Sequence, residues 1–358
     1  MDDKRDLASP GRAEAVSGRF PSMLPIFLPR GNRSDAENIV SIAVTACLGK
    51  GGSCKKMSES PKTAYVNVAV ATVWRNPGAP RPVDEPALAR PVRMNAWLAA
   101  MTNEAKKDLV GRVDTQALYG TKVTVLASDG DWAEVAVHGQ PGPNGRKTYP
   151  GWMPVRQLAD GETMRPYEGA RSVVVTVSKA WLYDPTGKSP ILEVSYGTRL
   201  PLVGEAEEAY TVATPDGVQR LRKSDAALDQ AVRPTGAMLV EEGLRFLGLD
   251  YLWGGMSAYG FDCSGFVHTV HKRFGITIPR DAGDQFKAGR PLKKGELQPG
   301  DLVFFAREKG KGAVHHVGFY AGAGQMLHAP QTGRSIERID LWGSEKFAES
   351  FIGGCRFI

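Results

Sequence analysis

Short runs in which apolar residues alternate with other residues dominate the chain from Ala64 to about residue 226. A first set contains YVNVAVATVW, TKVTVLA and WAEVAVHG, and a second contains RSVVVTVSKAWLYD, TRLPLVGE and AYTVATPDG. Gly, Pro, Asp and Asn bound the runs, which is typical of the short strands of a small antiparallel barrel. Because the order of the runs recurs, the pattern predicts two barrels of one type, at residues 63–160 and 168–226. Residues 85–111 have helical spacing and are predicted to be an insertion in the first barrel.

The pattern changes after a short linker, RPTG, near residue 234. The segments GAMLVEEGLRFLGLDY and FDCSGFVHTVHKRFG carry apolar residues at helical spacing, and Gly275 is a stop signal for the second helix. Three predicted strands follow, in GDLVFFA, HHVGFYAG and QMLHAP. Helices followed by an antiparallel sheet predict an α+β domain at residues 235–358.

Residues 1–62 differ from the rest of the chain and are predicted to be a leader. The segment IVSIAVTAC resembles the lipobox of a bacterial lipoprotein, which would make Cys47 a lipidated N-terminus and a membrane anchor. Its apolar core is short, and Asp35 and Glu37 stand where an export signal carries positive charge. A disordered leader or an incorrectly assigned start is the alternative. We expect the protein at the cell envelope or outside the cell, and a cytoplasmic location stays open.

Composition narrows the classes of function. The chain of 358 residues has 42% hydrophobic and 23% charged residues, which is ordinary for globular proteins, and no apolar run approaches the ~18 residues of a spanning helix. A net charge of +6 favours binding to polyanions. The sequence has no Lys/Arg cluster with interleaved aromatic residues, so it does not predict nucleic-acid binding. The four cysteines form no pattern with zinc-like spacing, and neither a metal nor another cofactor is expected.

Cys263 is the candidate nucleophile because it stands at the start of the second predicted helix. Unpaired N–H groups and the positive end of the helix dipole stabilise a thiolate at such a position. The alternative is that Cys263 is a small apolar residue of the helix stripe, which is the commoner role for a lone cysteine.

A nucleophilic cysteine also needs a base, and the chain has six histidines. His138 falls in a hairpin of the first barrel. His268 is rotated away from Cys263 on the same helix, and His271 lies about 12 Å further along its axis. None of these three can take the proton from Cys263.

The remaining histidines lie in the predicted hairpin HHVGFYAGAGQMLHA. A turn centred on Gly322 would place His316 opposite His328, with Cβ atoms about 5 Å apart, so that one ring could orient the other. His315 would then point to the other face in a structural role. A slip of one residue in the register would exchange these roles.

The motifs DCSGF, GDLVFF, HHVGFY and MLHAP, in this order and spacing, resemble the NlpC/P60 family of papain-like cysteine peptidases, which cut bacterial cell-wall peptides. The resemblance covers about residues 235–358. It implies that Cys263 is the nucleophile, His316 the general base and His328 the orienting third residue.

The two preceding barrels, with TQALYG, VHGQP and YPGWMP in the first, resemble the bacterial SH3 domains of YkfC-type γ-D-glutamyl-L-diamino acid endopeptidases. This implies a multidomain fold in which two small all-β SH3-like barrels precede an α+β papain-like domain. It also implies that Asp262 and Asp114 hold the free amine of an N-terminal L-alanine, and that Tyr149, Tyr251 and Ser264 complete the pocket. Taken singly, Asp262 could instead cap the helix, the tyrosines could be core residues, and Asp114 could be a solvated turn acid.

The expected function is hydrolysis of the γ-D-glutamyl bond to a diamino acid in peptidoglycan stem peptides with a free N-terminal L-alanine, as in murein recycling. Two residues depart from this subgroup: Asp114 stands where a glutamate is usual, and Ala282 stands where a serine is expected. The alternative is an autolysin that acts on intact peptidoglycan. A non-catalytic wall-binding protein is a further alternative, and the complete set of Cys263, His316 and His328 argues against it. The diamino acid and the oligomeric state stay open.

Overall fold

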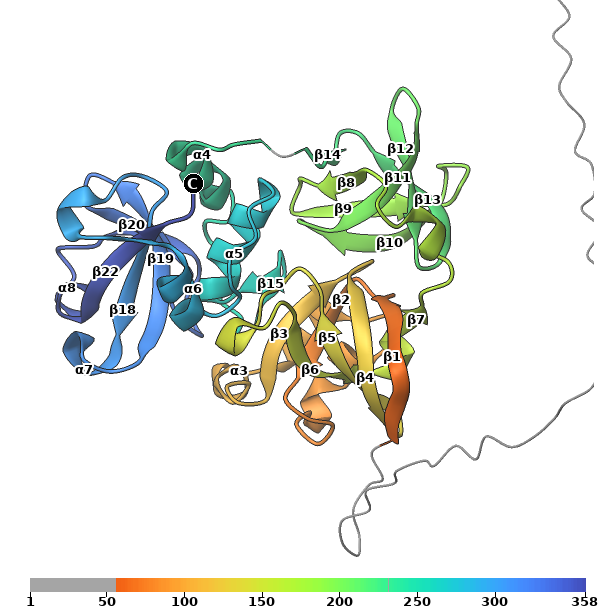
Figure 1. Ribbon diagram of the computed structural model, residues 1–358, viewed down its shortest axis with the longest axis horizontal. Helices are drawn as coiled ribbons and strands as arrows, with labels where there is room; N and C mark the ends of the chain where they lie inside the picture. Colours follow the sequence, from red (N-terminus) through yellow and green to blue (C-terminus); the bar gives the residue numbers. More distant parts are fainter. Residues whose placement is uncertain (1–55, 231) are drawn as a thin grey trace, which may run out of the picture. The chain divides into compact units, whose positions relative to one another are not determined.

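The computed structural model describes residues 56–230 and 232–358 (Figure 1). Cys47 and the apolar segment before it lie outside the described residues, so lipidation and location stay predictions. Strand β1 begins at Lys56, inside the range predicted as the leader. None of the helices in the described ranges combines the length and the apolar character that crossing a bilayer requires.

The first barrel is a seven-stranded antiparallel sheet with the order β3-β2-β6-β5-β4-β1-β7. Its strands are β1 (Lys56–Val66), β2 (Val70–Trp74), β3 (Val113–Leu118), β4 (Lys122–Asp129), β5 (Trp132–Val137), β6 (Tyr149–Pro154) and β7 (Leu158–Asp160). The predicted helical insertion between β2 and β3 consists of three short helices, α1 (Glu85–Leu88), α2 (Met94–Ala100) and α3 (Asn103–Lys107). The Trp97 side chain of α2 is fully buried, donates to Asp84 within the insertion and packs on Trp74 of β2, which anchors the insertion to the barrel.

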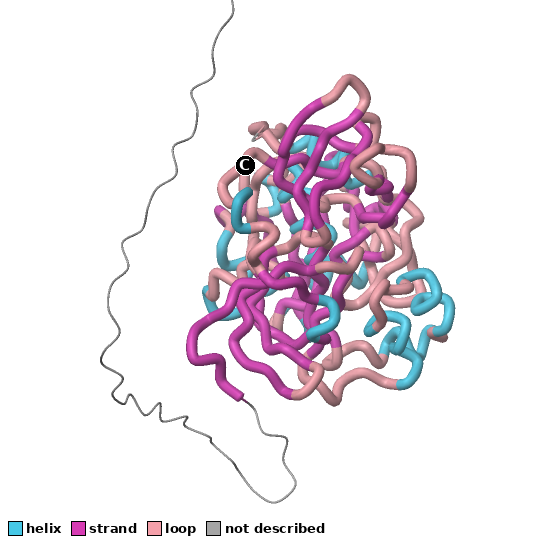
Figure 2. Tube along the Cα trace, turned by 90° about the vertical axis from the view of Figure 1, so that its right-hand side faces the viewer, coloured by secondary structure: helices cyan, strands magenta, loops and turns pink. Residues whose placement is uncertain are grey.

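The second barrel repeats this topology, with the order β10-β9-β13-β12-β11-β8-β14. Its strands are β8 (Ser172–Val175), β9 (Lys179–Tyr183), β10 (Pro190–Ser195), β11 (Arg199–Glu205), β12 (Ala209–Thr214), β13 (Gly217–Arg222) and β14 (Ala226–Leu228). Each strand holds the place of its counterpart in the first barrel, so the prediction of two barrels of one type is confirmed. Figure 2, coloured by secondary structure, shows the strands of the molecule in magenta.

The third domain has a six-stranded sheet with the order β17-β22-β18-β19-β20-β21, in which every pairing is antiparallel. The strands are β17 (Arg290–Leu292), β18 (Leu302–Ala306), β19 (Val314–Gly322), β20 (Gln325–His328), β21 (Glu337–Asp340) and β22 (Phe351–Arg356). A separate small pairing joins β15 (Met256–Ser257) and β16 (Gly260–Phe261). The helices are α4 (Gly236–Leu244), α5 (Cys263–Arg273), α6 (Ala282–Ala288), α7 (Arg307–Gly310) and α8 (Glu345–Ser350).

Helix α5 begins and ends where the sequence predicts. The Asp262 carboxylate caps it by accepting from the Gly265 N–H at 2.6 Å, and Gly275 has a φ of +78°, a left-handed conformation that suits glycine. Its apolar stripe packs on the sheet, where Phe266 meets Phe319 of β19 edge to face at 5.7 Å. In contrast to the one-sided stripe expected from the pattern, every residue from Cys263 to His271 is buried.

The first barrel contacts the loops around α5. Strand β3 accepts a hydrogen bond from the Trp253 indole at its Val113 carbonyl, and its Gln116 side chain accepts from the Met256 N–H. Lys272, at the end of α5, donates to the Gly139 carbonyl of the barrel. These contacts place β3 against the loop that precedes α5 and the loop at Gly139 against the end of α5.

Candidate active site

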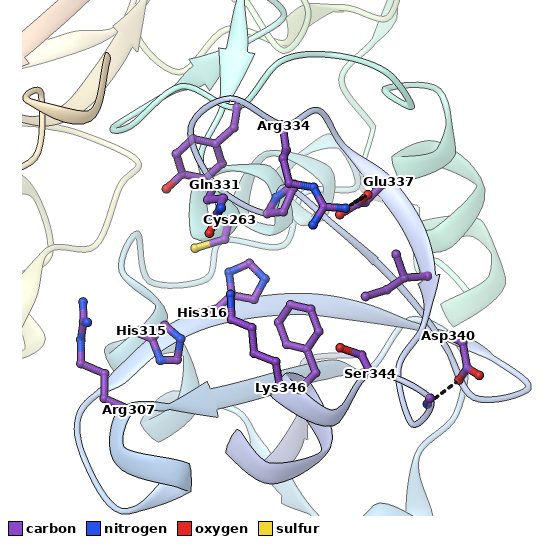
Figure 3. A pocket seen from close by; sticks show the side chains of 15 residues that line it. Cys263, Arg307, His315, His316, Gln331, Arg334, Glu337, Asp340, Ser344 and Lys346 are labelled. Carbon is purple, nitrogen blue, oxygen red and sulfur yellow. Dashed lines mark hydrogen bonds and ion pairs between the residues drawn. The ribbon is translucent and has the colours of Figure 1, made fainter. Parts of the chain in front are cut away.

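The candidate nucleophile, Cys263, lies at the first position of α5 and is 9% exposed. It lines a pocket of about 750 Å³ together with Tyr251 and His316. Figure 3 shows the Cys263 sulfur and the His316 ring in this pocket. Burial, with a smaller contribution from the charge of Asp262, raises the pKa of the Cys263 thiol to about 12. The sequence predicts a stabilised thiolate here, but in the structure desolvation outweighs the N–H groups of Ser264 and Val317 that favour the anion.

His316 and His328 form a hydrogen-bonded pair, with 2.8 Å between His316 Nε2 and His328 Nδ1. This bond leaves His316 Nδ1 as the nitrogen free to exchange a proton with the thiol. Phe347 of α8 covers the pair, stacking on His316 and meeting His328 edge to face. Burial lowers the pKa of His316 well below its ordinary value and that of His328 to about 3, which favours the neutral form of both imidazoles.

The hairpin that carries this pair has a different register from the predicted one. Tyr320 pairs with Met326, and a bulge separates this pairing from that of Gly322 with Gln325. The predicted alignment, with His316 directly opposite His328, is wrong by two residues. A shift of two keeps every side chain on its face of the sheet, and the two rings still meet.

Glu337 is a neighbour of His328 that the sequence interpretation missed. It is the register partner of His328 in the pairing of β20 with β21, and its Oε1 lies 3.4 Å from His328 Nε2. When His316 Nε2 donates to His328 Nδ1, the proton of His328 resides on Nε2 and faces this carboxylate. Arg334 holds the other oxygen of Glu337 at 2.6 Å. Glu337 follows a loop, and no sequence motif indicates that it lies next to His328.

His315 does not have the structural role expected for it. Phe305 pairs with His316 and Ala306 with Val314, so a bulge in β19 leaves His315 out of the ladder. Its side chain is exposed and lines the same pocket as Cys263.

Asp262, predicted to hold the substrate amine, is already held by protein groups. Arg280 approaches it with both terminal nitrogens, at 3.1 Å and 2.6 Å, and the N–H groups of Gly265 and Gly254 donate to the same carboxylate. The helix-cap alternative for Asp262 therefore holds in the structure. Arg280 is 1% exposed, and it was missed although the segment PRDAGDQ contains it.

Ser264 belongs to the same buried network. Its hydroxyl accepts from Arg280 at 2.9 Å and donates to Asp262 at 3.3 Å. Tyr251 is 8% exposed and lines the pocket beside Cys263. Burial, and next the charges of Cys263 and Asp262, raise the pKa of the Tyr251 phenol.

The predicted residues of the first barrel lie within reach of the Arg280 charge. The Tyr149 hydroxyl donates to the Asp281 carboxylate at 3.0 Å, and burial raises the pKa values of both groups. Asp114 on β3 is paired with Arg75, whose Nε lies 2.9 Å from its Oδ1. The structure thus brings all the predicted residues into one region and adds Arg280 and Asp281 to them.

This arrangement can perform acyl transfer. The thiol supplies a nucleophile, His316 Nδ1 can accept its proton, and the first N–H groups of α5 have no partner within the helix and can stabilise an oxyanion. In the described ranges, no group of three or more His, Cys, Asp or Glu side chains has an arrangement that could hold a metal ion.

Comparison with known proteins agrees with this class of site. Residues 248–351 match the model of the NlpC/P60 family, and residues 175–228 match that of the YKFC SH3b2 domain. The chain is 44% identical to a γ-D-glutamyl-L-lysine dipeptidyl-peptidase of Bacillus cereus, over 82% of this chain and 91% of that protein. It is 43% identical to a protein of the same name from Bacillus subtilis, over 76% and 92% of the two chains.

A solved structure superposes on most of the chain. The crystal structure of an NlpC/P60 family protein from Bacillus cereus superposes with a TM-score of 0.78 and 43% identity, covering 82% of this chain and 99% of that one. The three domains therefore define a cysteine peptidase with two SH3-like barrels. The chain belongs to the NlpC/P60 family.

Proposed function

We propose that this protein hydrolyses the bond between a γ-D-glutamyl residue and an L-diamino acid in short wall peptides whose N-terminal L-alanine has a free amine. The names of the two Bacillus relatives support the bond, since both are called γ-D-glutamyl-L-lysine dipeptidyl-peptidases. Releasing a dipeptide requires recognition of a nearby N-terminus. The observation that carries the proposal is therefore the acidic region beside the start of α5.

Asp281 is the carboxylate of this region best suited to bind an ammonium group. Arg280 neutralises Asp262, and Arg75 neutralises Asp114. Asp281 forms no ion pair within 4 Å among the described residues, and it accepts a hydrogen bond from Tyr149. An alanine ammonium would complete the charge balance that these pairs leave open. Asp281 and Tyr149 therefore bind the amine directly. Asp262 and Asp114, which were expected to bind it, instead help to position this site.

The catalytic steps follow from the geometry. The Cys263 sulfur attacks the γ-carbonyl as its proton passes to His316 Nδ1, and a tetrahedral oxyanion forms near the first N–H groups of α5. His316 then protonates the leaving amine, and the C–N bond breaks to give a thioester. Water, deprotonated by His316, hydrolyses the thioester and restores the thiol. His328 keeps the His316 ring oriented during both acylation and hydrolysis of the thioester.

The test compares L-Ala-γ-D-Glu-L-Lys with its N-acetylated form, and follows the products by mass spectrometry. We expect cleavage of the γ-bond in the free peptide, none with Cys263→Ala, and a value of kcat/KM lower by roughly 100-fold for the acetylated peptide, because acetylation leaves the Asp281 carboxylate unpaired. Asp281→Asn should remove most of this discrimination. Asp284→Asn, in the first turn of the helix that follows Asp281 but paired with Lys287, is the matched control and should retain it.

Equal cleavage of both peptides would favour the autolysin alternative, in which the natural substrate is the intact wall. No cleavage of either peptide would contradict the proposed bond. Retained discrimination in Asp281→Asn would leave the bond assignment intact and return the amine site to Asp262 and Asp114.

A further inference from the structure

The wall of the active-site pocket around His316 carries cationic side chains that the catalytic steps do not use. Arg307 of α7 and Lys346 of α8 both line the pocket, as does the exposed His315. Figure 3 shows the three side chains on the same side of the pocket as the His316 ring. Neither Arg307 nor Lys346 forms an ion pair with another described residue.

The other charged residues of the pocket are already engaged. Arg334 is paired with Glu337, and Glu337 also faces His328. The Asp340 carboxylate accepts from the N–H groups of Trp342 and Gly343, and it lies at the end of the pocket away from Arg307 (Figure 3). The part of the pocket beside His315 and His316 is therefore positively charged, and no acidic side chain among the described residues that line it balances this charge.

The chemistry of the reaction says which part of the substrate meets this wall. The leaving amine takes its proton from His316, so the residue that carries this amine must lie over the side of the pocket where His316 stands. The acyl half extends the other way, past Cys263 to the acidic region of Asp281 and Tyr149. The cationic wall therefore faces the diamino acid.

We propose that Arg307 and Lys346 bind a carboxylate of the leaving diamino acid, and so select peptides in which this residue carries a free carboxylate. The inference rests on the proposed function, since it takes the γ-D-glutamyl bond as the one that is cut. The carboxylate is either the α-carboxylate of a C-terminal diamino acid or the side-chain carboxylate of a diaminopimelate. Burial, and next the charges of both cations, lower the pKa of His315, and burial lowers that of His316 with a smaller contribution from Lys346. A bound carboxylate would offset this field and favour the protonated His316 that the leaving amine needs.

The experiment measures kcat/KM for four substrates. These are L-Ala-γ-D-Glu-L-Lys, its C-terminal amide, the meso-diaminopimelate tripeptide, and that tripeptide with only its α-carboxylate amidated. Loss of the recognised carboxylate should lower kcat/KM by about three- to fivefold, the effect of a partly screened ion pair. If the α-carboxylate is recognised, both amides are poorer substrates. If the side-chain carboxylate is recognised, both diaminopimelate peptides are better than both lysine peptides.

Variants assign the effect to the wall. In Arg307→Gln/Lys346→Gln the ratio between the preferred and the disfavoured substrates should fall below about twofold, and high salt should reduce the same ratio in the unaltered protein. Lys309→Gln, on the same short helix but paired with Glu349, is the matched control and should keep the ratio. Equal kcat/KM for all four substrates, or a ratio that survives the double substitution, would overturn the inference. Failure of the proposed function looks different, because then no substrate is cut at the γ-D-glutamyl bond.

Discussion

Replacing Arg280 with methionine should destabilise the protein strongly, although Arg280 is no part of the catalytic chemistry. The guanidinium is buried, and it donates to both oxygens of Asp262, to Ser264 and, across the domain boundary, to Thr115. Methionine has a similar length and removes all four hydrogen bonds. The Asp262 carboxylate then stays buried with only backbone N–H groups and the Ser264 hydroxyl as partners.

The magnitude follows from what is left behind. Removing one partner of a buried ion pair costs about 3–5 kcal/mol, chiefly because the remaining charge is desolvated and unpaired. The donors that Asp262 keeps place the cost toward the lower part of this range, and the lost bonds to Ser264 and Thr115 add about 1 kcal/mol each. We therefore expect a loss of roughly 5 kcal/mol in the free energy of unfolding.

Urea unfolding of both proteins, followed by tryptophan fluorescence and circular dichroism, measures this loss. Arg75→Met is the matched control, because Arg75 pairs with Asp114 but is 58% exposed, and such a pair contributes less than about 1 kcal/mol. Arg280→Met/Asp262→Asn should be more stable than Arg280→Met, because it leaves no unpaired charge. The reasoning is refuted if Arg280→Met and Arg75→Met lose similar amounts of stability.

Three other predictions concern the histidines. His328→Phe should lower kcat by roughly 100-fold or more with little change in KM, in steady-state assays of a cleaved peptide, because His316 loses its orienting bond; an unchanged kcat would contradict this role. Glu337→Gln should move the acidic limb of the profile of kcat/KM against pH to lower pH, because a carboxylate facing His328 favours the protonated form of the His316–His328 pair. An unmoved limb would show that Glu337 does not act on this pair. The folded-state pKa values of about 4 for His271 and 3 for His328 lie below the ordinary value. The unfolded state therefore binds more protons below pH ~6.5, and stability should fall by about 1.4 kcal/mol per histidine between pH 7.5 and 5.5 in urea titrations.

Much of the fold was predictable because short stretches of the sequence determine it. Alternation and turn residues predict the two barrels, and the recurrence of their order predicts a shared topology that the structure confirms. Helix α5 follows from its cap at Asp262 and its stop at Gly275. The burial of its second face was not predictable, since it depends on packing against a barrel distant in sequence.

The same distinction applies to the site. Arg280 contacts Asp262 across 18 positions and Thr115 across 165, so no local pattern connects them. The pKa of Cys263 is a further case, because the helix start argues for a stabilised thiolate and only the three-dimensional burial reverses the direction of the shift. Sequence reasoning finds residue types that the chemistry needs, whereas their partners and their desolvation come from long-range packing.

The histidine hairpin shows how an incorrect register can still yield a correct contact. The predicted register was displaced by two residues from the observed pairing of Tyr320 with Met326, and an even displacement leaves each side chain on its own face. The contact between His316 and His328 therefore survived the error. The bulge at His315 is an odd displacement, one extra residue in β19, and it brought that side chain into the pocket instead of onto the face expected for it. The face of the sheet on which a side chain lies is thus more predictable than the residue with which it pairs. The exception is a bulge, which adds one residue to a strand.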